Sequence, residues 1–273
     1  MSYRIWANHA HVFPEGAKDE AQISVLKQVM SECGIEKAVC FTCFENQYAR
    51  SGLPGDENSW LYEQIKNDSS LIGFGTINFD RDDIKEQVQR ITAYGFKGIK
   101  LHPAYQEVHI LGEKPRIVYE QAQKDGLFLS FHTGLHWHRL SDYHPLLFDE
   151  LAWDYPELKF SMEHIGGYHF FKDALAVMCN NARRGVPVYA GWTSIAYSET
   201  GIPDAWSLSD EELKIVVAQT GNKSSIFGLD FPYKKTEQLR PAIDRIINLD
   251  IPEEAKIGIL GKNLADALGM DWE

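Results

Sequence analysis

Short runs rich in β-branched and aromatic residues alternate along the whole chain with amphipathic segments that have helical spacing. Eight of these runs are predicted to be strands: 4–11, 37–43, 71–77, 98–102, 127–133, 159–165, 187–193 and 224–231. The helices are predicted over 17–33, 82–94, 115–124, 145–154, 171–181, 209–220, 236–248 and 253–268. This alternation is typical of a parallel sheet whose strands are joined by crossover helices.

The number of repeats favours a single domain over residues 1–273. Eight strand–helix units in a chain of this length predict a (β/α)8 TIM barrel, somewhat distorted, with an extra C-terminal helix. An open doubly wound sheet is the alternative, but no GxGxxG follows the first strand, which disfavours its dinucleotide-binding version. In a barrel, the long connections 44–58, 134–144 and 194–208 would all lie at the carboxyl ends of the strands, where active sites are built.

The charge of the chain limits its partners. It carries 39 acidic and 27 basic residues, a formal net charge of −12. Nucleic acid is therefore disfavoured, because its phosphates would be repelled, whereas a small-molecule substrate stays open. No apolar run approaches the ~20 residues that span a bilayer, and the polar start does not resemble a signal peptide. We therefore expect a soluble, cytoplasmic protein.

Cys40 and Cys43 form a CxxC, which could be redox-active or half of a zinc site. The surrounding AVCFTC has the character of a buried strand, and the chain contains no second CxxC. We therefore favour the interpretation that both thiols pack as small hydrophobic groups.

Polar side chains gather at the predicted strand ends. His9 and His11 end the first strand at i, i+2 spacing, so both point to the same side. Later strand ends carry Lys100, His102, His132, His164 and Asp230. A single histidine at a strand end is more often structural. The combination of several with an aspartate, converging on one barrel axis, indicates a site for a divalent metal.

Six stretches give the chain a resemblance to the amidohydrolase superfamily, in particular to its aminocarboxymuconate-semialdehyde decarboxylase-like branch. They are NHAH (8–11), GFKGIKLHP (95–103), SFHTG (130–134), YPELKFSMEHIGG (155–167), FGLDFP (227–232) and ILGKNLADALGM (259–270). The fourth and fifth are the most specific. Together they run from one end of the chain to the other in the expected order.

The resemblance implies a barrel that holds one divalent metal, usually zinc, with manganese as the alternative. Its ligands would be His9, His11, His132 and Asp230. His164 would polarise the substrate or transfer a proton, although in some relatives this histidine is a ligand. Relatives often form dimers, so a homodimer is a possible assembly.

Two positions depart from the pattern of the family. Many relatives have aspartate before the HxH, where this chain has Asn8. Some members carry a carboxylated lysine that bridges two metals in the region of Lys100. The GIKLHP context does not resemble that bridging type, so we expect Lys100 to be solvated or ion-paired.

This set of residues predicts a metal-dependent hydrolase of a small amide, lactone or ester that uses a metal-activated water. Asp230 could accept the proton of the water, and His164 could stabilise the developing oxyanion. The alternative is a metal-dependent, non-oxidative decarboxylase of a small unsaturated or aromatic carboxylate. A third possibility is a metal-binding barrel that has lost catalysis.

Substrate-binding residues are predicted from the strand ends and the long loops: Arg50, Lys100, His102, Trp137, Arg139 and Trp192. Aromatic side chains with a few cations suit a small cyclic carboxylate. The alternative is that the aromatic side chains only pack the loops against the barrel.

Overall fold

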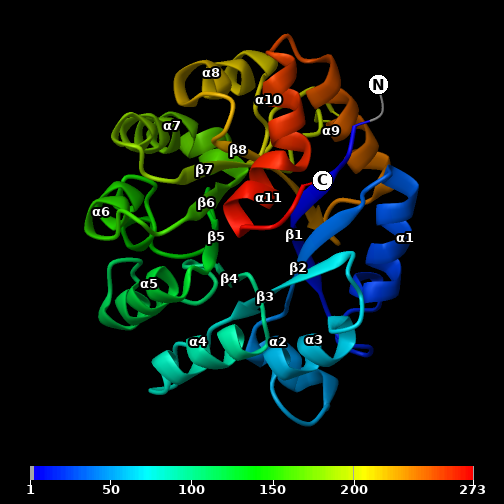
Figure 1. Cartoon of the computed structure of the whole chain (residues 1–273), viewed down its shortest axis with the longest axis vertical. Helices are drawn as coiled ribbons and strands as arrows, with labels where there is room; N and C mark the ends of the chain where they lie inside the picture. The colour runs from blue at the N-terminus through cyan, green and yellow to red at the C-terminus, as the bar shows by residue number, and fades with distance from the viewer. Residues whose placement is uncertain (1–2, 199, 273) are drawn as a thin grey trace.

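In the computed structural model, which describes residues 3–198 and 200–272, eight parallel strands close into one barrel in sequence order (Figure 1). The strands are β1 (Trp6–Val12), β2 (Lys37–Thr42), β3 (Leu71–Thr76), β4 (Gly98–Leu101), β5 (Phe128–His132), β6 (Phe160–Glu163), β7 (Val188–Thr193) and β8 (Ser225–Phe231). The prediction of a TIM barrel is therefore confirmed, and each predicted strand overlaps an observed one.

Helices surround the barrel between successive strands, and further helices follow the last strand (Figure 1). They are α1 (Ile23–Cys33), α2 (Glu45–Tyr48), α3 (Glu57–Ile65), α4 (Ile84–Ala93), α5 (Glu113–Asp125), α6 (Leu147–Asp154), α7 (Gly167–Arg184), α8 (Asp210–Thr220), α9 (Thr236–Asn248), α10 (Glu253–Ile257) and α11 (Asn263–Leu268). In the described part of the chain, no helix combines the length and apolar character needed to cross a membrane.

The prediction of a long connection over 44–58 and of one helix over 253–268 was wrong in detail. Within the first segment lies α2, and α3 begins at its end, where the Asp56 side chain accepts a hydrogen bond from the Ser59 amide at 2.9 Å. This is an N-cap, which stabilises the start of a helix. The second segment is divided by a π-helical turn, Gly258–Lys262, between α10 and α11.

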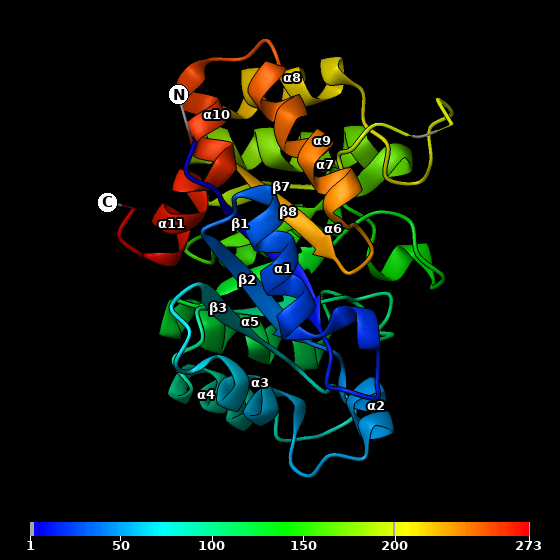
Figure 2. The ribbon, with the colours of Figure 1, turned by 90° about the vertical axis from the view of Figure 1, so that its right-hand side faces the viewer.

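The barrel interior is apolar near the starts of the strands and polar near their ends. Near the starts of their strands, Trp6, Ile72, Phe128 and Ile226 are buried in one apolar cluster that also contains residues of α11. That helix lies across the middle of the barrel in Figure 1. In Figure 2 it lies at the left with both termini, while the connections after β5 and β7 project to the right. The polar strand ends therefore face the end of the barrel that α11 does not close.

The distortion of the barrel is concentrated in β1. Its register with β2 shifts between Ala7 and Ala10, and its register with β8 shifts between Asn8 and Ala10. Such a bulge re-aims a side chain. The backbone of His9, inside this bulge, has a φ of 66°.

All four cysteines are free thiols, and Cys40 and Cys43 are buried. Burial raises the pKa of the Cys40 thiol to about 12 and that of Cys43 to about 11. A reactive or metal-binding cysteine needs a lowered pKa. The interpretation of these thiols as packing groups is therefore supported.

Candidate metal centre

Three predicted ligands meet where β1 and β8 end. The ligand atoms of His9, His11 and Asp230 all lie within 4.8 Å of one another, and the described residues contain no other such group of three. Asp230 Oδ1 is 3.6 Å from His9 Nε2 and 4.0 Å from His11 Nε2. Two ligands of a tetrahedral zinc ion lie about 3.4 Å apart. The three side chains therefore fit a divalent metal with small adjustments.

The histidines at this end of the barrel are held neutral by burial. Desolvation lowers the pKa of His9, His11, His102 and His132 well below the ordinary value. It lowers the pKa of His164 to about 3. A neutral imidazole has the free lone pair that metal binding requires.

The predicted fourth ligand, His132, lies beside the group of three. Its ring stacks on that of His102, with 3.8 Å between centroids and 11° between planes. Its centroid is 4.9 Å from that of His164. Within the described structure, His132 Nε2 and His164 Nδ1 are buried without a hydrogen-bond partner. Orphaned buried nitrogens are costly, so both are suited to a bound group.

Asp230 is buried and tightly held. Desolvation raises the pKa of its carboxyl to about 6, and the hydrogen bond that the Ser194 hydroxyl donates to Oδ2 at 2.6 Å opposes this rise. Oδ2 is therefore engaged, while Oδ1 faces the two histidines of β1.

Backbone strain is concentrated at the same place. Six described residues other than glycine have a positive φ between 52° and 66°. Five of them lie at the strand ends of this site: His9, His164, Ile165, Ser194 and Asp230. A non-glycine residue in this region costs about 1–3 kcal/mol and is found mostly at functional sites.

Lys100 was expected to be solvated or ion-paired, and the first of these alternatives is wrong. Its side chain is not solvated but completely buried inside the barrel, with Nζ 3.4 Å from each ring nitrogen of His9. Burial lowers the pKa of Lys100 to about 7, while the carboxylates of Glu163 and Asp230 oppose this change. The sequence alone could not reveal this, because lysine is seldom fully buried.

Two aromatic residues near the site were missed in the sequence. Trp206, from the connection after β7, lies 4.5 Å from the ring of His164 and 5.3 Å from that of His132, between centroids. Tyr233 follows β8, and its ring lies 5.4 Å from that of His11. Their positions in long connections were the only signal that could have indicated them.

The predicted substrate-binding residues are only partly brought to the site. His102 and Lys100 lie in it, as described above. Trp192 is completely buried in the larger hydrophobic cluster, which lies outside the apolar barrel interior. Arg50 and Arg139 are exposed, and Trp137 is 96% exposed, with its ring 5.0 Å from that of His136.

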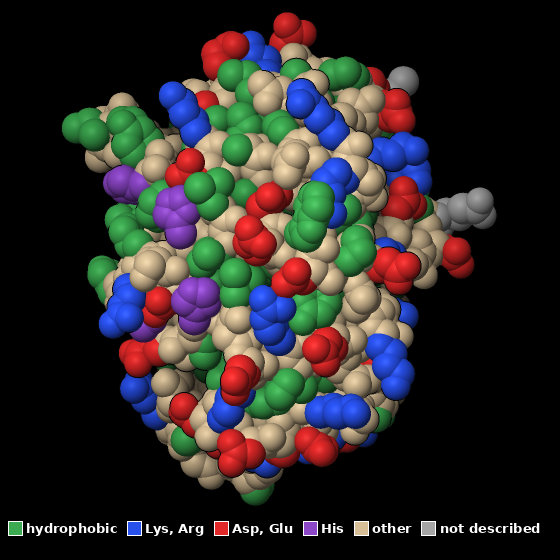
Figure 3. All heavy atoms as spheres, turned by 90° about the vertical axis from the view of Figure 1, so that its left-hand side faces the viewer, with side chains coloured by type: hydrophobic (Ala, Val, Ile, Leu, Met, Phe, Trp, Pro, Cys, Tyr) green, Lys and Arg blue, Asp and Glu red, His purple; other side chains and the backbone are tan. Residues whose placement is uncertain are grey.

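The remaining histidines are peripheral: His109, His138, His144 and His169 lie on loops or on α7. Figure 3 shows the face over α5, α6 and α7, where histidines lie among mixed acidic, basic and hydrophobic side chains. His138 and His144 each lie near a carboxylate, at 3.1 Å from Asp142 and 3.3 Å from Asp173. Abundance of histidine alone therefore did not identify the centre.

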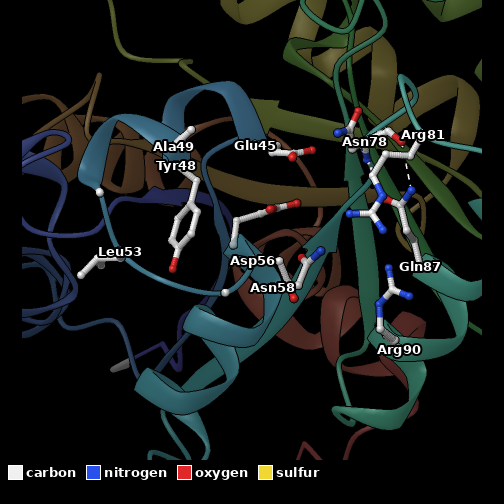
Figure 4. A pocket seen from close by; sticks show the side chains of 13 residues that line it. Glu45, Tyr48, Ala49, Leu53, Asp56, Asn58, Asn78, Arg81, Gln87 and Arg90 are labelled. Carbon is white, nitrogen blue, oxygen red and sulfur yellow. Dashed lines mark hydrogen bonds between the residues drawn. The ribbon is translucent and has the colours of Figure 1, made fainter. Parts of the chain in front are cut away.

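A separate cavity of about 350 Å³ lies among α2, α3 and α4 (Figure 4). None of the predicted site residues lines it. Many of its polar groups are already paired: Arg81 and Arg90 bind Asp83, and the Asn58 amide bonds the backbone of Thr76. Glu57 differs from these paired groups, because its carboxyl is only 4% exposed and burial raises its pKa to about 7.

Replacing Glu57 with glutamine is expected to stabilise the protein at pH 8 by about 3 kcal/mol, because one pKa unit corresponds to about 1.4 kcal/mol. The folded pKa lies above the unfolded one, so the wild type loses stability as pH rises from about 4.5 to about 7. Glutamine removes this penalty. Chemical denaturation should therefore give a difference at pH 8 that is nearly absent at pH 4.5. Glu86→Gln, on the exposed face of α4, should show neither effect, and an equal change at both pH values would contradict the argument.

Comparison with known proteins gives the following matches. The amidohydrolase family matches over residues 44–269. None of the curated proteins matches the chain.

Three solved structures have a similar fold. An uncharacterized TIM-barrel protein from Bordetella bronchiseptica has a TM-score of 0.74 at 17% identity, covering 97% of this chain and 98% of its own. A dihydroxybenzoic acid decarboxylase from Polaromonas, with bound manganese and the inhibitor 2-nitroresorcinol, has a TM-score of 0.71 at 13% identity, covering 98% and 97%. A proposed 2-pyrone-4,6-dicarboxylic acid hydrolase from Pseudomonas putida has a TM-score of 0.69 at 17% identity, covering 100% of both chains.

Proposed function

Because the chain belongs to the amidohydrolase family, we propose that it is a metal-dependent hydrolase of a small organic amide, lactone or ester, for which a cyclic carboxylate is one candidate. The observation that carries this proposal is the group formed by His9, His11 and Asp230, whose ligand atoms lie within 4.8 Å of one another. His132, with its unpartnered Nε2, would complete the set. Zinc or manganese would supply a Lewis acid and an activated water.

The side chains around this group would transfer protons and hold the substrate. Asp230, which is buried with Oδ1 facing the two histidines of β1, could accept a proton from the activated water and return it to a leaving group. His164 lies 5.4 Å from His9 between ring centroids and would face the substrate oxygen. The stacked rings of His102 and His132 would offer a flat face to a planar substrate, and the ring of Trp206 lies beside His132 at 80° to it.

A second candidate function is non-oxidative decarboxylation of an aromatic carboxylate. The stacked rings of His102 and His132 favour it, since a planar ring could stack on their flat face. A screen of lactones, esters, amides and hydroxybenzoates with the zinc and manganese forms separates the two. Ring opening or ester cleavage without CO₂ supports hydrolysis, whereas release of CO₂ supports decarboxylation. Replacing Arg50 and Arg139 with alanine tests whether these exposed cations affect KM for carboxylates.

Replacing His11 with alanine is expected to weaken metal binding by more than about 100-fold, because removing a ligand should cost more than removing an outer partner. Elemental analysis after dialysis should then find far less zinc than in the wild type. His109→Ala removes an exposed imidazole and should keep the wild-type content. Wild-type protein that holds no metal and takes up neither zinc nor manganese would instead support a barrel that has lost catalysis.

A further inference from the structure

The carboxylate of Glu163, the last residue of β6, is completely buried at the centre of the barrel. It accepts hydrogen bonds from side chains of four different strands. Oε1 receives Asn8 Nδ2 at 2.7 Å, Ser130 Oγ at 3.1 Å and the Ser161 hydroxyl, while Oε2 receives Thr193 Oγ1 at 2.5 Å. These donors hold both oxygens of the carboxylate in one orientation.

Two glycines leave the room that this carboxylate needs. A Cβ on Gly191 of β7 would lie 2.4 Å from Glu163 Oε2. A Cβ on Gly228 of β8 would lie 3.3 Å from the same oxygen and 2.2 Å from Thr193 Oγ1. A side chain on Gly191 would therefore displace the carboxylate, and one on Gly228 would displace the Thr193 hydroxyl that donates to it.

The carboxylate lies behind one of the candidate metal ligands. Oε2 is 3.3 Å from Nδ1 of His9, while Nε2 of the same ring is 3.6 Å from Asp230 Oδ1. An anion beside Nδ1 favours the tautomer that carries its proton there, which leaves the lone pair of Nε2 for a metal. Lys100 Nζ also lies 3.4 Å from both nitrogens, so the ring is held between a carboxylate and an amine.

We propose that Glu163 is a positioning residue, which fixes the ring of His9 for metal binding through the network of Asn8, Ser130, Ser161 and Thr193. The inference rests on the proposed metal centre, and it assigns a role to a residue that is not itself a ligand. Asn8 belongs to the same network, because its side-chain amide donates a hydrogen bond to Glu163 Oε1 at 2.7 Å. An aspartate at this position would instead place a second carboxylate against that of Glu163.

The test is the zinc affinity of metal-free protein, measured by competition with a chromophoric chelator. Glu163→Gln keeps the size of the side chain and removes its charge, and we expect 10–100-fold weaker zinc binding, as is usual for partners of metal ligands. Wild-type affinity in this variant would overturn the proposal. A wild type that binds no zinc would instead refute the metal centre, so the two failures are distinguishable.

A double substitution separates positioning from simple stabilisation. Asn8→Asp should lower the melting temperature, because two carboxylates would then face and repel each other inside the barrel. In the double variant with Glu163→Gln, position 8 carries the carboxylate and position 163 the amide. An amide–carboxylate pair is thereby restored, so the melting temperature should recover. The zinc affinity should stay at least tenfold below the wild type, because no carboxylate faces His9. Full recovery of the affinity would mean that only the hydrogen bond matters, and would overturn the proposal.

Milder variants give the answer if Glu163→Gln fails to fold. Thr193→Val removes the donor to Oε2, the oxygen that faces His9, whereas Ser130→Ala removes a donor to Oε1. The first should weaken zinc binding several-fold more than the second. Equal affinities in these two variants would overturn the proposal.

Discussion

Replacing Asp230 with asparagine is expected to lower kcat for the substrate that the screen identifies by about 10²–10⁴-fold, the usual contribution of a general acid–base group. Asparagine keeps the shape of the side chain and its hydrogen bond to Ser194, but it cannot take up a proton. The measurement is kcat at saturating zinc or manganese.

Ser194→Ala is the matched control, because it removes only the hydrogen bond to Oδ2 and leaves the carboxylate in place. We expect its kcat to fall far less than that of the asparagine variant. Wild-type turnover in Asp230→Asn at full metal occupancy would show that another group accepts the proton. Loss of metal without a change in kcat per bound metal would limit Asp230 to a role as ligand.

Replacing Gly98 with alanine is expected to destabilise the barrel by about 3 kcal/mol, at the upper end of the usual cost of overpacking. A Cβ at this position in β4 would lie 2.3 Å from the carbonyl oxygen of Phe128 and 2.7 Å from the ring of Phe74. The oxygen belongs to the paired backbone of β5, so it cannot rotate away as a side chain could. Chemical denaturation measures the change directly.

Gly185→Ala provides the comparison, because a Cβ there would meet nothing within 4 Å. Its φ of 74° still makes alanine unfavourable, at a cost of about 1–2 kcal/mol. The Gly98 variant should therefore unfold at a clearly lower denaturant concentration. Equal midpoints would contradict this expectation, because they would mean that the backbone of β5 moves aside at little cost.

The architecture could be predicted from the sequence because it depends on local patterns that repeat. Each strand and most helices are specified by the periodicity of their own residues. The short helix α3 was missed, since Asp56 and Ser59 form its cap inside a stretch rich in glycine and proline. The break between α10 and α11 was missed because it follows from packing against the barrel.

The sequence by itself determined the barrel, the family resemblance and the ligand candidates at the strand ends. Only the tertiary structure decided which candidates meet, because positions such as His9 and Asp230 are more than 200 residues apart in the chain. It brought His9, His11 and Asp230 together, stacked His132 on His102, and directed Trp192 into the core. It also buried Lys100 and Glu163, whose surroundings come from several strands far apart in the chain and therefore cannot be predicted from any local pattern.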